Sequence, residues 1–175
     1  LDFGKTSTPF LEADEVLGRM NDEFGSNYLT ETSLLAAARA AGLSTAAIGK
    51  TGPIAIQDVT ARDGSQTIVI DDSISKPQGL MLAPEIVKAI ADAGLPPVAP
   101  KKAVPNTEQN AYMLAITTKV VLPRLKASGK PFVLVFWSRD PDASQHETKD
   151  SIGKLSPGIN GPSGKAGIRN ASDTF

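Results

Sequence analysis

The sequence contains no cysteine and a single histidine, and aromatic residues make up only 5% of its 175 positions. Without cysteine the chain cannot form disulfides, bind a metal through thiolates or use a thiol nucleophile. This composition fits a reducing cytoplasm or an exported protein that has no disulfides. No apolar run approaches the ~18–20 residues of a spanning helix, so we expect no membrane partner.

An excess of charge of one sign is also lacking. Lysine and arginine together number 18 and aspartate and glutamate 19, and the chain has no basic run. A nucleic-acid surface is normally a basic patch or stripe, so we expect no nucleic-acid partner.

The length and composition are those of one globular domain, with 41% hydrophobic and 21% charged residues. The chain opens at Leu1 without an initiator methionine and closes on Phe175 in what reads as an unfinished helix. We therefore expect residues 1–175 to be a single partial domain, an internal or processed segment of a larger protein.

Helical and strand patterns alternate along the chain. Helices are predicted at 30–42, 84–94, 106–130 and from 164 onward, and strands at 43–50, 66–72 and 131–137. In the first helix Leu34, Leu35, Ala38 and Ala41 share one face. Strand 131–137 is apolar at every position, as expected for a central strand covered on both faces. The pattern predicts an α/β fold with a mainly parallel central sheet and helices on both faces.

The long helix at 106–130 has a predicted start and a predicted kink. Asn106 with Gln109 three residues later predicts a capped N-terminus. Pro123 predicts a kink near the end, because proline removes a helical hydrogen bond.

Polar residues of the kind that bind ligands follow two of the predicted strands. Gly49-Lys50-Thr51 is not a phosphate loop, since Ser44 occupies the position of the required glycine and no clear helix follows. Lys50 is instead either a lone cation at the ligand-binding edge of the sheet or a solvated lysine in a turn. Asp71 and Asp72 point to opposite faces of a strand, so we expect a solvated turn there.

A third group of polar residues follows strand 131–137. Asp140, Asp142 and His146 come directly after its carboxyl end, and Pro141 stiffens the turn. Carboxylate and imidazole both suit zinc, and a spacing of four brings Asp142 and His146 together if the loop forms a helical turn. The alternative is that Asp142 caps a turn and His146 merely lies in it.

The segment FWSRDPDASQH (136–146) resembles the metal-binding segment of the type I phosphodiesterase and nucleotide pyrophosphatase branch of the alkaline phosphatase superfamily. That branch reads Glu-Pro-Asp-x-x-Gly-His after a strand, and its Asp and His bind one of two zinc ions. Asp142 and His146 match these ligands and Pro141 matches the proline. Asp140 replaces the glutamate and Gln145 the glycine.

A second segment, LLAAARAAGLSTAAIGKTGP (34–53), resembles the helix–strand unit of the same superfamily. In the sulfatase branch the lysine that matches Lys50 contacts the anionic group of the substrate, whereas the histidine that follows it is replaced here by Thr51-Gly52-Pro53. The resemblance runs from about Thr8 to Phe175 and implies an alkaline-phosphatase-like fold, incomplete in this chain.

The resemblance implies a segment of a two-metal phosphoester hydrolase acting on phosphodiester or pyrophosphate bonds. Asp142 and His146 would supply half of one zinc site, with two zinc ions in the complete enzyme and Lys50 as an anion contact. The nucleophile and the other ligands would lie outside this chain, which alone should not catalyse. Expected partners are the remaining fragments of a nicked protein and a phosphate-ester substrate, in the periplasm or secreted.

Two alternatives remain open. The chain could be a non-catalytic α/β fragment or degenerate relative that binds a ligand or partner. A weaker alternative is a sulfatase or phosphomutase of the same superfamily.

Overall fold

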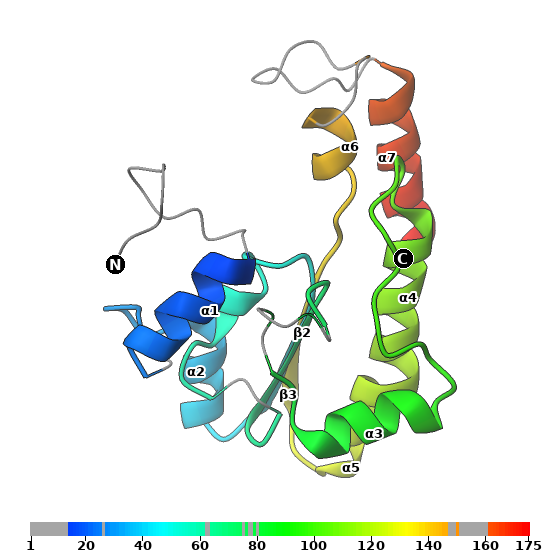
Figure 1. Cartoon of the computed structure of the whole chain (residues 1–175). Coiled ribbons are helices and arrows are strands. Elements are labelled where there is room, and N and C mark those ends of the chain that lie inside the picture. The colour runs from blue at the N-terminus through cyan, green and yellow to red at the C-terminus, as the bar shows by residue number, and fades with distance from the viewer. Residues whose placement is uncertain are drawn as a thin grey trace.

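The chain folds as a small α/β domain in which a parallel sheet lies between helices (Figure 1). This computed structural model describes residues 14–25, 27–61, 64–74, 76, 79, 81–146, 150 and 161–175, without the side chains of residues 14, 15 and 146. The strands are β1 (Ser44–Gly49), β2 (Thr67–Asp71) and β3 (Phe132–Trp137). The α-helices are α1 (Asp14–Glu23), α2 (Leu34–Ala40), α3 (Pro84–Asp92), α4 (Thr107–Ile116), α5 (Leu122–Ala127), α6 (Asp142–His146) and α7 (Pro162–Thr174).

The strands of the described sheet are all parallel, in the order β2-β1-β3. The three predicted strands and the parallel arrangement are thereby confirmed. The prediction that 131–137 is the central strand is wrong for the described sheet: β1 is central and β3 lies at the edge, with Phe132 39% and Trp137 45% exposed. A continuous apolar run indicates cover over both faces of a strand, but it does not say how many strands pair with it.

Helices cover both faces of the sheet, as the alternating pattern predicts. On one face Ile48 of β1 and Ile70 of β2 pack in a core with residues of α3 and α4, among them Ile86 and Ile116. On the other face β1 and β2 pack against Leu35 of α2. Leu34 is 61% exposed and Ala41, just after α2, is also exposed, so the predicted apolar face is wrong at these two residues.

The predicted long helix is present in three consecutive segments, α4, a π-helical turn η2 (Thr117–Val121) and α5. Pro123 lies in the first turn of α5, where the missing N–H is tolerated best. Asn106 and Gln109 do not form a capping box, because both side chains bond elsewhere: Asn106 with Ala103 and Asp140, and Gln109 with Pro100 and Asp72.

None of the helices in the part of the chain that the structure describes has the length and hydropathy needed to cross a bilayer.

The amino end of β2 is fastened by a buried carboxylate, Asp58. Its oxygens accept hydrogen bonds from the hydroxyl of Thr67 at 2.6 Å, from the amide and hydroxyl of Thr60 at 3.0 and 2.8 Å, and from Nε of Arg39 at 3.3 Å. Asp58 thereby ties the loop after β1 to both β2 and α2. Burial alone would raise the pKa of Asp58, but the hydrogen bonds from Thr67, Thr60 and Arg39 outweigh it and leave this pKa lowered.

This lowered pKa predicts a loss of stability in acid. The folded pKa lies below the unfolded value, so the stabilisation is complete above the unfolded pKa of about 4 and disappears as the pH falls through the folded pKa. Asp58→Asn should lower the free energy of unfolding at pH 7 by about 1.5–3 kcal/mol, the range for hydrogen bonds to a charged group. Urea denaturation from pH 7 to pH 3 should also show a shallower acid dependence in the variant. An identical slope in both proteins would contradict the assignment.

Candidate functional site at the carboxyl edge of the sheet

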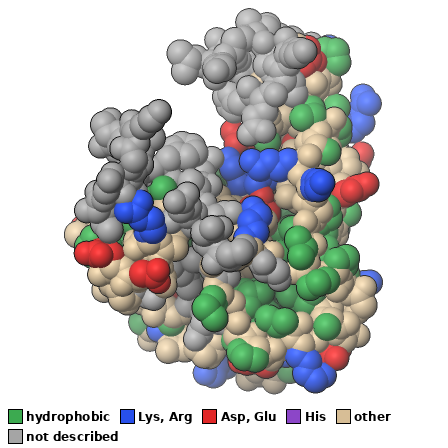
Figure 2. Space-filling view, in the orientation of Figure 1, with side chains coloured by type: hydrophobic (Ala, Val, Ile, Leu, Met, Phe, Trp, Pro, Cys, Tyr) green, Lys and Arg blue, Asp and Glu red, His purple; other side chains and the backbone are tan. Residues whose placement is uncertain are grey.

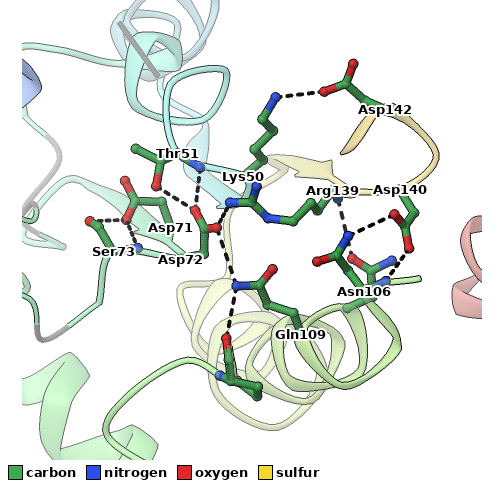
Figure 3. A network of polar contacts seen from close by, with 12 residues as sticks. Lys50, Thr51, Asp71, Asp72, Ser73, Asn106, Gln109, Arg139, Asp140 and Asp142 are labelled. Carbon is green, nitrogen blue, oxygen red and sulfur yellow. Dashed lines mark hydrogen bonds and ion pairs between the residues drawn. The ribbon is translucent and has the colours of Figure 1, made fainter. Parts of the chain in front are cut away.

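Polar side chains converge where the three strands end. Lys50 follows β1, Asp71 and Asp72 end or follow β2, and Arg139 comes just after β3 (Figure 3). The carboxyl ends of parallel strands meet at one edge of a sheet, which is where open α/β sheets bind their ligands.

A glycine allows the ends of β1 and β3 to approach each other closely. Gly49 has a φ of +139°, and a Cβ at this position would collide with the carbonyl group of Trp137. The next amide, that of Lys50, donates a hydrogen bond to this same carbonyl oxygen at 3.1 Å. Gly49 therefore lets the backbone bring Lys50 to the residues that follow β3.

Asp72 and Arg139 form a buried ion pair at this edge, with side chains 5% and 7% exposed. The second oxygen of Asp72 accepts hydrogen bonds from the amide and hydroxyl of Thr51 at 2.8 and 2.5 Å. Asp71 is also buried and accepts a bond of 2.8 Å from the amide of Ser73. The expectation of a solvated turn at Asp71 and Asp72 is therefore wrong, because Arg139 and nearby N–H and O–H groups replace water around them.

Lys50 forms the second ion pair of the site. Its Nζ lies 2.8 Å from Oδ2 of Asp142, the first residue of α6 (Figure 3). The side chain of Lys50 is 10% exposed and that of Asp142 is 50% exposed. Lys50 is thus a buried cation and not the solvated turn lysine that the sequence left as an alternative.

A buried carboxylate, Asp140, holds the start of α6. One oxygen accepts from Nδ2 of Asn106 at 3.0 Å and from the hydroxyl of Ser144 at 2.6 Å. The other accepts from the amide of Asn106 and from Nδ2 of Asn170, both at 2.7 Å. Asp140 therefore joins the N-terminus of α4, α6 and α7, and it fixes the position from which Asp142 reaches Lys50.

The two predicted metal ligands stand at the ends of one helical turn. The range Asp142–His146 is helix α6, which is the local structure that their spacing required. The side chain of His146 lies outside the described residues. Among the residues that are described, no group of three His, Cys, Asp or Glu side chains could hold a metal ion, and Asp142 already bonds Lys50. These residues do not by themselves fit a complete zinc site.

A small hollow lies beside Lys50 and the Asp72–Arg139 pair. Its lining includes Lys50, Asp72, Gln109 and Arg139, and Figure 2 shows basic side chains gathered near the middle of this face beside acidic ones. Its volume of about 10 Å³ is close to the room that one water molecule needs. At this size the hollow is too small for a phosphate group.

Sequence reasoning missed Arg139 and Gln109. The sequence did indicate a role for Arg139. It is a cation just after one strand, Asp71 and Asp72 end another strand, and parallel strands end at the same edge of a sheet. Gln109 left no such signal, because it lies inside a helix and reaches Asp72 only through the packing of α4 on the sheet.

Comparison with known proteins found no relative of this chain. No protein-family model, no curated protein and no solved structure matches this chain.

Proposed function

We propose that this chain forms part of the active site of a metal-dependent phosphoric ester hydrolase, in which Lys50 contacts the anionic group of the ester. One observation carries the proposal: an almost buried ammonium lies at the carboxyl end of the central parallel strand, opposite a half-exposed carboxylate. A lysine so placed must keep an anion beside it, because an isolated buried charge is costly. A phosphate ester supplies such an anion.

The proposed metal is zinc, with Asp142 and His146 as two of its ligands. Support comes from their position on one helical turn at the ligand-binding edge and from the resemblance of 136–146 to the zinc segment of phosphodiesterases. Zinc held there would polarise the phosphoryl group and lower the pKa of water. The remaining ligands and the nucleophile would come from polypeptide outside this chain.

The proposed fold is the alkaline-phosphatase type, incomplete in these residues. β3 supports this, because it is apolar throughout yet lies at the edge of the described sheet. Such strands normally have neighbours and covering helices on both sides. The remaining pieces of the same protein are the partners that would complete the sheet, and a periplasmic or secreted location is consistent with the absence of cysteine.

The mass of the purified protein, measured native and denatured, is the first test. Zinc content and turnover of a phosphodiester, a phosphomonoester and a sulfate ester are then measured on the native assembly. We expect bound zinc and a preference for the diester.

Asp142→Asn and His146→Ala should each lower activity by more than about 100-fold, since even second-shell changes cost 10–100-fold. Asp92→Asn, which removes an exposed carboxylate of α3, is the matched control. Unchanged zinc and activity in both site variants would refute the metal assignment.

The second candidate is a non-catalytic binding module. It is favoured by the lack of a metal-holding group of three among the described side chains and by the ion pairs that Lys50 and Arg139 already make. A protein that binds an oxyanion through Lys50, holds no zinc and hydrolyses none of the three esters would establish this candidate instead.

A further inference from the structure

The ion pair between Lys50 and Asp142 is unequal in its exposure to water. The ammonium is almost buried, with its side chain 10% exposed, while the carboxylate side chain is 50% exposed. Lys50 directly follows the central strand and its amide bonds to Trp137 of β3. The position of Lys50 is therefore fixed by the sheet, and the position of Asp142 depends on the short helix α6.

Because of this difference in exposure, Lys50 needs the ion pair more than Asp142 does. Moving the buried ammonium of Lys50 away from an anion leaves an uncompensated buried charge, which is strongly unfavourable. The carboxylate of Asp142 is half exposed, so it regains hydration when it leaves Lys50. Lys50 requires an anion, but that anion need not be Asp142.

The neighbouring ion pair differs, because both of its side chains, Arg139 and Asp72, are buried. Thr51 also donates two hydrogen bonds to the second carboxylate oxygen of Asp72. Neither partner can turn into water without breaking several buried bonds. The site thus combines one fixed ion pair with one exchangeable pair.

We propose that Asp142 is an internal competitor for the anion site of Lys50: in the metal-free chain its carboxylate pairs with the ammonium, and it leaves when a phosphate-sized oxyanion binds. The choice of phosphate as the anion rests on the proposed function. The apparent affinity for phosphate is then the intrinsic affinity reduced by the fraction of molecules in which Asp142 has turned away.

The test is titration of the 175-residue chain with inorganic phosphate, followed by calorimetry and by amide NMR shifts. Asp142→Asn should bind phosphate about three- to tenfold more tightly than wild type, because a half-exposed pair no longer has to be broken. Asp92→Asn is the matched control, since Asp92 also pairs with a lysine, Lys88 at 2.6 Å, and the variant has the same net charge. Affinity in this control should not change.

A double variant ties the effect to Lys50. Lys50→Met/Asp142→Asn removes both charges and should lose the added affinity, while thermal melting confirms that it is folded. Tight binding that depends on Lys50 but does not increase in Asp142→Asn beyond the Asp92→Asn control would overturn the competitor role and leave the anion contact intact. Binding that is undetectable, or unaffected by loss of Lys50, would overturn both this inference and the anion contact of the proposed function.

Discussion

Replacing Arg139 by methionine is expected to lower the free energy of unfolding by about 3–5 kcal/mol, the range for breaking a buried ion pair from one side. Arg139 and Asp72 are each less than one-tenth exposed, so the variant leaves the carboxylate of Asp72 buried without its cation. Thr51 would still donate two hydrogen bonds to Asp72 but cannot neutralise its charge. Urea denaturation at pH 7 measures the loss.

Two further variants separate the charge from the lost side-chain volume. Adding Asp72→Asn to Arg139→Met should recover part of the lost stability, because the unpaired charge is then gone and the amide oxygen still accepts from Thr51. Lys88→Met, at the exposed pair with Asp92, should change stability by less than about 1 kcal/mol. If Arg139→Met behaved like Lys88→Met, the buried pair would not contribute as the structure indicates.

Asp140→Asn is expected to cost about 2–4 kcal/mol, although the two side chains have the same shape. Both oxygens of Asp140 accept two hydrogen bonds each, from Asn106, Ser144 and Asn170. An amide in this place turns one acceptor into a donor, which then faces other donors. The effect should appear as a lower denaturation midpoint and as weaker attachment of α6 and α7 in hydrogen exchange.

Asp92→Asn is the control for this prediction, since it makes the same chemical change on an exposed side chain of α3. Its stability should stay within about 0.5 kcal/mol of wild type, as for most surface substitutions. Equal stability of the Asp140 and Asp92 variants would show that the buried bonds of Asp140 are not what holds α6.

The sequence predicted the strands and most helices because their signals are local. The apolar run at 132–137 and the glycine after α2 each determine the structure of their own segment. The candidate site was predicted in part by the same means, since Lys50 and Asp142 follow strands and parallel strands end together. The contact between them is not local, and their pairing was not predicted.

The failures at Asp72 and Asn106 share one physical cause. Asp72 looked solvated because a turn residue usually is, and Asn106 looked like a helix cap because its position allows one. Both side chains instead found partners from distant segments, Arg139 and Asp140. Local preference amounts to about 1 kcal/mol, and a buried, charge-assisted hydrogen bond is worth more. Tertiary partners therefore prevail at the residues that build the site.

The pairing of β1 with β3 determines when the site forms during folding. Lys50 and Asp142 are 92 residues apart, and the strand pair that brings them together encloses β2, α3, α4 and α5. Closing so long a loop costs entropy before any contact at its end offsets it. The anion site should therefore form late in folding and in a single step, and an early intermediate that has paired β1 with β2 would still hold Lys50 in water.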